Sequence, residues 1–423
     1  MNRSILFLPL LVLILSCGNP ASKSAIEYNE LSHLNVHLDS IFEVHGLMGL
    51  ETILILEGDS AYHYKNGLKD YERNLKIDDQ TLYRIASISK TITATAIMQL
   101  VENGDLDLNT DVSEYLGWSL RNPSFPDSPI TLHHLLSHQS GIRDGQSYSV
   151  FSRNMRSEQL DIKELFQPSG RYFGQDVFAN HEPGEYFSYT NCTWGIIASI
   201  IEKASGLRFD NYCKKQIFDP LEMSASFNVL DIEDINDLAT LYRYDSIEWI
   251  AQVDHYEGEH PDSVIYSNYQ LGQNGLLFGP QGSLRATSKD LMRFAQMMIQ
   301  GGTMDGIKIL ASSSLENMKG SHYEFKENNG DTWENFFLSY GYGLHRILNT
   351  ENGDIIFPDR KMYGHPGIAY GLLSDMYFDP ITQSGIIFIT NGSKYNFEYG
   401  QSSSFYEVEE AIFQVMYDHI EKY

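Results

Sequence analysis

The chain has 423 residues, of which 42% are hydrophobic and 20% are charged. Such a composition predicts a folded protein with a large core and excludes a disordered chain. The formal net charge of −26 would repel the phosphate groups of a nucleic acid, so no nucleic-acid partner is expected.

The first residues predict export. Arg3 precedes an apolar run over residues 5–15, which is too short to span a bilayer and is typical of a signal-peptide core. Ser16-Cys17-Gly18 follows directly and resembles a bacterial lipoprotein cleavage site. We therefore predict a signal peptide over residues 1–16 and lipid attached to Cys17. An ordinary secretory signal with a chance cysteine is the alternative.

Residues 17–25 are mostly small and polar and are predicted to form a tether between the lipid and the folded part. The expected product is an exported bacterial lipoprotein, anchored to a membrane on its periplasmic or cell-surface face. Residues 26–423 show no internal repeat and no second linker, so one domain is expected there.

Within this domain, strand patterns occur near both ends and helical patterns between them. This order predicts an α+β fold in which the two chain ends build a sheet and a mainly helical insertion separates them. The predicted elements are a helix over 26–44, strands over 52–56 and 61–65, a helix over 81–102, helices and loops over 105–330, strands over 343–348, 372–378 and 385–390, and a helix over 404–420.

A serine and a lysine three residues apart open the strongest helical pattern. Ser87 and Lys90 would lie one turn apart on the same face of a helix. A serine hydroxyl becomes a nucleophile when a nearby base takes its proton, and a lysine can be that base when dry surroundings lower its pKa. An N-terminal serine with a solvated lysine is the alternative, but this is the only Ser-x-x-Lys in the chain.

Two further motifs carry polar groups that could join this pair. Tyr189-Thr190-Asn191 follows a Pro-Gly turn and precedes a helical pattern that ends at Gly206. A tyrosine phenol can act as a base if a lysine cation lowers its pKa, and an amide can hold a carbonyl or the lysine. His365-Pro366-Gly367-Ile368 precedes a predicted strand. Taken singly, each motif is more often a packing tyrosine or a surface turn.

In this order and spacing, the three motifs resemble those of the serine β-lactamase and penicillin-binding-protein family, in the branch of class C β-lactamases, D,D-carboxypeptidases and esterases. The family's signature is Ser-x-x-Lys, Tyr-x-Asn, and Lys- or His-x-Gly. Residues 130–142 and 282–291 also resemble family segments, and we interpret both as structural. The resemblance implies the β-lactamase/transpeptidase-like fold, with an antiparallel sheet flanked by helices.

The resemblance also implies roles for individual residues. Ser87 would form an acyl-enzyme, Lys90 and Tyr189 would share the general-base work, and Asn191 would orient the substrate. Backbone N–H groups of Ser87 and Ile368 would bind the oxyanion. His365 would lie near the substrate's carboxylate or leaving group, and Gly367 would belong to the substrate-binding residues.

Two residues depart from the family pattern. His365 replaces the lysine of class C β-lactamases, and an unperturbed histidine is mostly neutral at pH 7. Pro366 replaces a common Thr or Ser and removes a hydroxyl that could bind a carboxylate. Both changes weaken the expectation of β-lactam hydrolysis and of D-Ala-D-Ala cleavage.

The leading hypothesis is therefore a serine hydrolase acting on a small-molecule or peptide substrate outside the cytoplasm. Its substrate could be a cell-wall D-Ala-D-Ala peptide, a β-lactam, or a small ester or D-amino-acid peptide. The alternative is a non-catalytic, membrane-tethered sensor or binding protein that kept the pocket. No cofactor and no metal are expected, and Cys192 and Cys213 are interpreted as buried free thiols.

Overall fold

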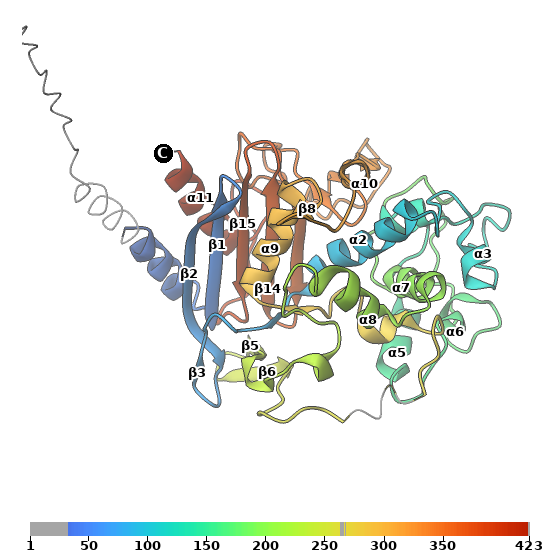
Figure 1. Cartoon of the computed structure of the whole chain (residues 1–423), viewed down its shortest axis with the longest axis horizontal. Helices are drawn as coiled ribbons and strands as arrows, with labels where there is room; N and C mark the ends of the chain where they lie inside the picture. Colours follow the sequence, from blue (N-terminus) through green and yellow to red (C-terminus); the bar gives the residue numbers. More distant parts are fainter. Residues whose placement is uncertain (1–32, 263–265, 267, 422–423) are drawn as a thin grey trace, which may run out of the picture.

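A computed structural model describes residues 33–262, 266 and 268–421. Its centre is a nine-stranded antiparallel sheet in the order β10-β11-β12-β13-β14-β15-β1-β2-β3 (Figure 1). The N-terminal strand β1 (Gly49–Leu56) pairs with the C-terminal strand β15 (Ser384–Thr390), and Ile53 lies opposite Ile387. The α+β prediction, with a sheet built from both chain ends, is confirmed. The predicted signal peptide, Cys17 and the tether lie outside the described residues.

The other strands are β2 (Asp59–Asp70), β3 (Leu75–Lys76), β4 (Tyr83–Arg84), β5 (Leu241–Tyr244), β6 (Trp249–Val253), β7 (Arg285–Ala286), β8 (Thr303–Met304), β9 (Ile307–Lys308), β10 (Tyr323–Glu324), β11 (Ser339–Tyr340), β12 (His345–Arg346), β13 (Tyr363–Ala369) and β14 (Leu372–Asp379). The helices are η1 (Ala86–Ile88), α2 (Ser89–Glu102), α3 (Val112–Leu116), α4 (Leu132–Leu136), α5 (Gln146–Asn154), α6 (Lys163–Phe166), α7 (Cys192–Ser205), α8 (Phe209–Cys213), η2 (Lys214–Phe218), η3 (Val229–Asp231), η4 (Ile235–Asp237), η6 (Gly275–Phe278), α9 (Ser288–Ile299), α10 (Ser312–Met318) and α11 (Glu407–Ile420). Residues 33–44 are also helical.

The central strands are buried on both faces, because helices cover both sides of the sheet. Successive side chains of a strand point to opposite faces. Ile53 and Ile55 of β1 join the core that contains α9, whereas Leu50 and Leu54 join a second core that contains α11 and the helix of residues 33–44. The sheet is therefore the middle layer of three.

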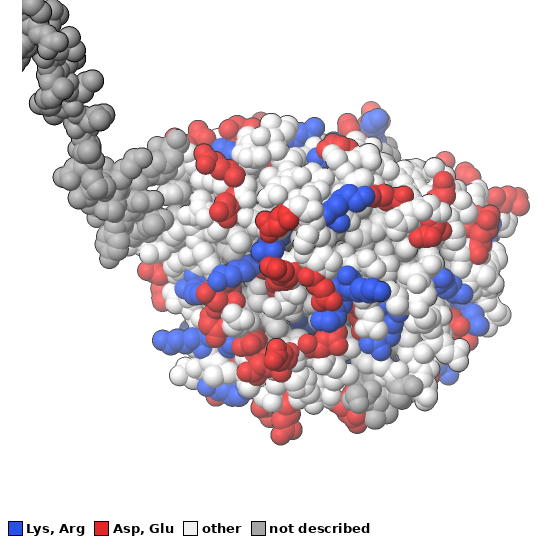
Figure 2. All heavy atoms as spheres, viewed as in Figure 1, with Lys and Arg blue, Asp and Glu red and all other residues white. Residues whose placement is uncertain are grey.

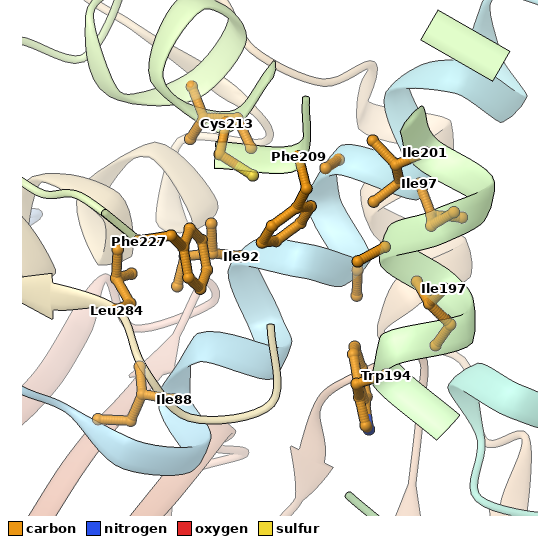
Figure 3. Close-up of a cluster of buried hydrophobic side chains, with 14 of the residues drawn as sticks. Ile88, Ile92, Ile97, Trp194, Ile197, Ile201, Phe209, Cys213, Phe227 and Leu284 are labelled. Atoms are coloured by element: carbon orange, nitrogen blue, oxygen red, sulfur yellow. The ribbon is translucent and has the colours of Figure 1, made fainter. Parts of the chain in front are cut away.

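The mainly helical insertion packs beside the sheet (Figure 1). Its centre is the contact between α2 and α7. Figure 3 shows Ile92 and Ile97 of α2 gathered with Ile197 and Ile201 of α7 in one buried cluster. This packing fixes the start of α2 and the start of α7 relative to each other. The motif with Ser87 and Lys90 lies at the first of these helix starts, and the motif with Tyr189 and Asn191 lies at the second.

The helix predicted over 81–102 begins later than expected, at Ser89. Tyr83 and Arg84 form strand β4 instead, paired with β7, and Ala86 has a left-handed φ of 48° that an α-helix cannot contain. Helix α9 begins at a capping box, in which the side chain of Thr287 accepts the backbone N–H of Asp290.

A buried ion cluster ties the segment before Ser87 to the rest of the protein. Arg84 donates to Asp254 through Nε (2.9 Å) and Nη2 (2.8 Å), and Arg285 donates through Nη2 (2.7 Å). Burial opposes ionisation of Asp254, but the charges of Arg285 and Arg84 outweigh it and hold its pKa well below the ordinary value. The carboxylate thus holds β4 and β7 together beneath the candidate site.

Replacing Asp254 with Asn is expected to lower the free energy of unfolding by about 3–5 kcal/mol, because two buried guanidinium groups lose their counter-charge. Urea unfolding followed by circular dichroism at pH 7 measures this loss. The depressed pKa means that the stabilisation is present at neutral pH and disappears as the pH falls through the folded-state pKa. The free energy of unfolding of the variant should therefore fall less on acidification than that of the wild type. An equal fall in both proteins would contradict this account.

The surface carries both signs of charge. On the face shown in Figure 2, Lys and Arg side chains are interspersed with Asp and Glu, which gather around its lower centre. No helix in the described part of the chain is long and apolar enough to cross a membrane.

Candidate active site

Ser87 lies in η1 directly before α2, Lys90 lies in the first turn of α2, and the two are close together, as the three-residue spacing predicts. Lys90 Nζ lies 2.9 Å from Ser87 Oγ. Lys90 is fully buried, whereas Ser87 is only half-buried. A solvent-reachable hydroxyl therefore faces an amine that water does not reach.

The amine of Lys90 has two further partners, and both are obligate acceptors. Asn191 Oδ1 and the backbone carbonyl of Gln281 each lie 2.9 Å from Nζ. Burial lowers the pKa of Lys90 to about 7, although the charge of Asp144 acts in the opposite direction. In the neutral amine, the two oxygens take the two N–H groups, so the lone pair points at Ser87 Oγ. This is the arrangement that a general base for Ser87 requires.

Tyr189 completes the surroundings of Ser87. Lys90 Nζ lies 4.8 Å from the centre of its ring. Burial raises the pKa of Tyr189 well above its ordinary value, and a hydrogen bond with Ser87 only partly opposes this. The sequence suggested that the lysine cation would lower this pKa, but burial lowers the pKa of Lys90 itself to about 7, so only about half of the amine is charged at pH 7. A tyrosine hydroxyl with a raised pKa can donate a proton but is a poor acceptor of one near neutral pH.

Asp144 determines which way the amide of Asn191 faces. Its carboxylate accepts the side-chain Nδ2–H of Asn191 (2.8 Å) and the backbone N–H groups of Asn191 (2.8 Å) and Cys192 (2.9 Å). Because Nδ2 is held by Asp144, Oδ1 is the atom left to face Lys90. The same carboxylate satisfies free N–H groups at the start of α7.

Strand β13 passes close to the segment that carries Ser87. A Cβ atom at Gly367 would lie 2.4 Å from the carbonyl oxygen of Ile85, so only glycine fits there. Ser374 of β14 donates to that carbonyl at 3.0 Å and binds the two segments together. Gly367 and Ile368 therefore lie beside the segment that carries Ser87, where the resemblance places the substrate-binding edge.

His365 is on the same strand, but both of its ring nitrogens have internal partners. Nδ1 lies 2.6 Å from the carbonyl oxygen of Pro366, and Nε2 lies 2.8 Å from the hydroxyl of Tyr340. Burial lowers the pKa of His365 well below its ordinary value, and the charge of Lys90 adds to this effect. The imidazole is neutral, and it can contact a substrate only if one of these hydrogen bonds opens.

Two neighbours of the site were not predicted from the sequence. Asp144 lies 47 positions before Asn191, and only the fold brings the two together. His138 lies in a segment interpreted as structural, yet its ring centre is 4.4 Å from that of Tyr189. Its Nδ1 accepts the backbone N–H of Thr190 at 3.1 Å, so His138 fixes the turn that presents Tyr189.

The described residues contain no group of three or more His, Cys, Asp or Glu side chains that could hold a metal ion. Cys192 and Cys213 are buried and unpaired. Burial raises the pKa of both thiols well above the ordinary value, so neither competes with Ser87 as a nucleophile.

The antiparallel sheet flanked by helices, with a serine and a buried lysine at the start of one helix, is the architecture of the active-site serine hydrolases with a Ser-x-x-Lys motif. The Beta-lactamase family model matches residues 40–402. The chain belongs to this family.

Relatives and solved structures agree with this assignment. The chain is 28% identical over 374 residues to penicillin-binding protein 4* of Bacillus subtilis (strain 168), covering 86% of this chain and 73% of that protein. It is similar in structure to an octameric penicillin-binding protein homologue from Pyrococcus abyssi, with a TM-score of 0.65 and 26% identity over 86% of this chain and 74% of the other. The D-amino acid amidase from Ochrobactrum anthropi SV3 has the same fold, with a TM-score of 0.64 and 22% identity over 92% of this chain and 99% of the other.

Proposed function

We propose that the protein hydrolyses an ester, amide or peptide through an acyl-enzyme on Ser87. The observation that carries this proposal is the buried amine of Lys90, whose two amide acceptors leave its lone pair facing Ser87 Oγ. A lysine with only a structural role would not require a serine hydroxyl as the third hydrogen-bond partner of its buried amine. This arrangement argues against the alternative of a non-catalytic sensor.

The proposed reaction has two halves. Ser87 Oγ bonds to the substrate's carbonyl carbon while its proton passes to Lys90 Nζ. Tyr189 then gives its hydroxyl proton to the leaving group and regains one from Lys90, and the bond to the leaving group breaks. A water molecule attacks the acyl carbon and gives a proton to the same two groups. They pass a proton to Ser87 Oγ as its bond to the acyl carbon breaks. The acid product departs, and the Ser87 hydroxyl is restored.

Preorganised donors would stabilise the negative oxygen that forms in each half. The resemblance assigns this task to the backbone N–H groups of Ser87 and Ile368. The close packing of β13 against the Ile85 carbonyl supports it, because it brings Ile368 beside the nucleophile. Such donors contribute about 10²- to 10³-fold to kcat in other acyl-transferring enzymes.

Within this activity, we favour neutral esters or amides over substrates recognised by a free carboxylate. His365 is neutral and internally hydrogen-bonded, and Pro366 has no hydroxyl to offer. β-Lactams and D-Ala-D-Ala peptides both carry such a carboxylate.

The test is intact-mass spectrometry of the protein lacking residues 1–17, incubated with a fluorophosphonate and, separately, with a penicillin. We expect a phosphonate adduct that is absent from the Ser87→Ala variant, since only an activated serine reacts. We also expect little penicillin reaction. A stable penicilloyl adduct would instead indicate a penicillin-binding peptidase, and rapid turnover a β-lactamase. Folded protein that takes neither label would favour the sensor.

We further propose that the enzyme acts outside the cytoplasm as a lipoprotein anchored through Cys17. The signal-peptide pattern of residues 1–16 supports this proposal. Labelling of cells with a radioactive fatty acid is expected to mark the wild-type protein and not a Cys17→Ser variant.

A further inference from the structure

A cavity adjoins the candidate active site on the far side of Ile368. Its volume is about 280 Å³, which is sufficient for an aromatic ring, because a cavity of about 150 Å³ can already bind benzene. Its lining includes Trp333, Phe336, Ile368, Tyr399, Tyr406 and Glu409. We call this cavity the aromatic pocket.

The aromatic pocket shares its walls with the catalytic centre. Ile368 lies on β13, at the position assigned to the oxyanion. The Trp333 ring lies with its centre 5.0 Å from that of Tyr189. A substrate whose carbonyl carbon lies at Ser87 can therefore extend a substituent past Ile368 into this cavity.

The rim of the pocket is unusually apolar for a surface. Trp333 is 44% exposed, Ile368 46% and Tyr399 50%, so three large side chains face solvent together. Tyr399 stacks on Tyr406 with ring centres 5.0 Å apart, which makes a flat wall. An exposed apolar patch at the mouth of a cavity is typical of a ligand-binding site.

The acidic group at the base of the pocket does not make it a cation site. Glu409 accepts the backbone N–H of Tyr406 at 2.7 Å, and the buried Asp375 lies against it. Burial raises the pKa of Glu409, and burial together with the nearby Glu409 raises that of Asp375 well above its ordinary value. The two carboxyl groups therefore carry less than their full formal charge of −2 near neutral pH.

The loop that holds Trp333 is under backbone strain. Trp333, Glu334 and Asn335 have left-handed φ values of 48°, 56° and 68°. Consecutive left-handed residues that are not glycine are rare, because each brings Cβ too close to the backbone. Ser404 Oγ donates to the Glu334 carbonyl at 2.7 Å and helps to keep the loop in this form. The fold thus maintains an unfavourable conformation that places the indole between Tyr189 and the pocket.

We propose that the aromatic pocket binds an uncharged aromatic or branched apolar group of the substrate, next to the bond that is cleaved. This inference rests on the proposed function and adds the substrate class: neutral esters or amides that carry a ring-sized apolar substituent.

Binding is tested separately from turnover. The Ser87→Ala protein is titrated with 3-phenylpropanamide, 3-phenylpropanoate and 3-phenylpropylammonium while tryptophan fluorescence is followed. These probes share one ring and differ in charge. We expect the neutral amide to bind at least about tenfold more tightly than either ion, because a charge loses its hydration in an apolar cavity. Equal affinities, or tighter binding of the ammonium ion, would overturn the proposal.

Turnover adds a second readout and a matched pair of variants. We expect kcat/KM for p-nitrophenyl 3-phenylpropanoate to fall about tenfold in Tyr399→Ala, which removes one wall, and to stay within twofold in Tyr395→Ala. Tyr395 is also exposed, at 62%, and does not line the pocket. Hydrolysis of p-nitrophenyl acetate should not change in Tyr395→Ala, and in Tyr399→Ala it should fall much less than hydrolysis of the phenylpropanoate, because the acetyl group is too short to reach the pocket. Equal effects of the two substitutions would overturn the assignment of the pocket. If the wild type takes no fluorophosphonate label at Ser87, the proposed hydrolase activity itself is refuted.

Discussion

Replacing Lys90 with Met is expected to lower kcat/KM by about 10²- to 10⁴-fold, which is the range for loss of a general base. Met is as long as the aliphatic part of Lys and suits the buried position, so the fold should survive. Lys90→Arg is the matched control: it keeps the positive charge but cannot lose a proton near neutral pH. Both variants should be equally inactive toward an activated ester.

The pH profile of the wild type tests the same assignment. With a pKa of about 7, Lys90 becomes a base as the pH rises through neutrality. We expect kcat/KM to rise about tenfold per pH unit below pH 7 and to level off above it. If Tyr189 were the resting base, the rise would continue to pH 10 or beyond, because burial raises the pKa of Tyr189 well above its ordinary value. Activity of Lys90→Met within tenfold of the wild type would also contradict the assignment.

The sequence alone could predict the parts of the site that depend on local spacing. Ser87 and Lys90 are three residues apart, and one helical turn places them together whatever the rest of the chain does. The alternation of strand and helix patterns was likewise sufficient to predict a sheet made from both ends. These are short-range regularities, and the structure confirms them.

Properties that depend on burial could not be predicted in the same way. Whether Lys90 lowers the pKa of Tyr189 depends on the charge of Lys90, and that charge depends on how dry the site is. Likewise, the sequence did not predict that the hydroxyl of Tyr340 lies 2.8 Å from Nε2 of His365. No sequence pattern indicates this pairing, because the two residues meet only through the fold.

The aromatic pocket is a further example of long-range assembly. Trp333, Ile368 and Tyr399 come from a loop, a strand and a second loop. Each is an ordinary apolar residue in its own segment. Their joint exposure around one cavity becomes visible only when the sheet and α11 are in place.

Replacing Asp144 with Asn is expected to lower kcat about 10²-fold, in line with the cost of misplacing a catalytic group by about 1 Å. The physical reason is the amide of Asn191. Once Asp144 no longer holds Nδ2, the amide can rotate and present N–H groups to Lys90. The amine must then turn its lone pair toward Asn191 and away from Ser87. Asp144 touches neither substrate nor Ser87 in this account, so it is a positioning residue.

A purely structural role of Asp144 makes a different prediction. Loss of a carboxylate that caps α7 should cost about 1 kcal/mol of stability and leave the pH profile where it was. We expect the profile to move as well. The charge of Asp144 raises the pKa of Lys90. Removing that charge should therefore move the acidic limb of the profile, in which kcat/KM rises with pH, to lower pH values.

Asp176→Asn is the matched control for this experiment. Asp176 accepts the backbone N–H of Ser147 (2.8 Å) and its hydroxyl (2.6 Å) near the start of α5, so it also holds a helix start but lies in no contact with Lys90. The control should lose similar stability while kcat and the acidic limb stay unchanged. If both variants lower kcat equally without moving the limb, Asp144 supports the fold only. If Asp144→Asn alone moves the limb and lowers kcat, the orientation of one amide, set from 47 positions away, determines whether Lys90 can act as a base.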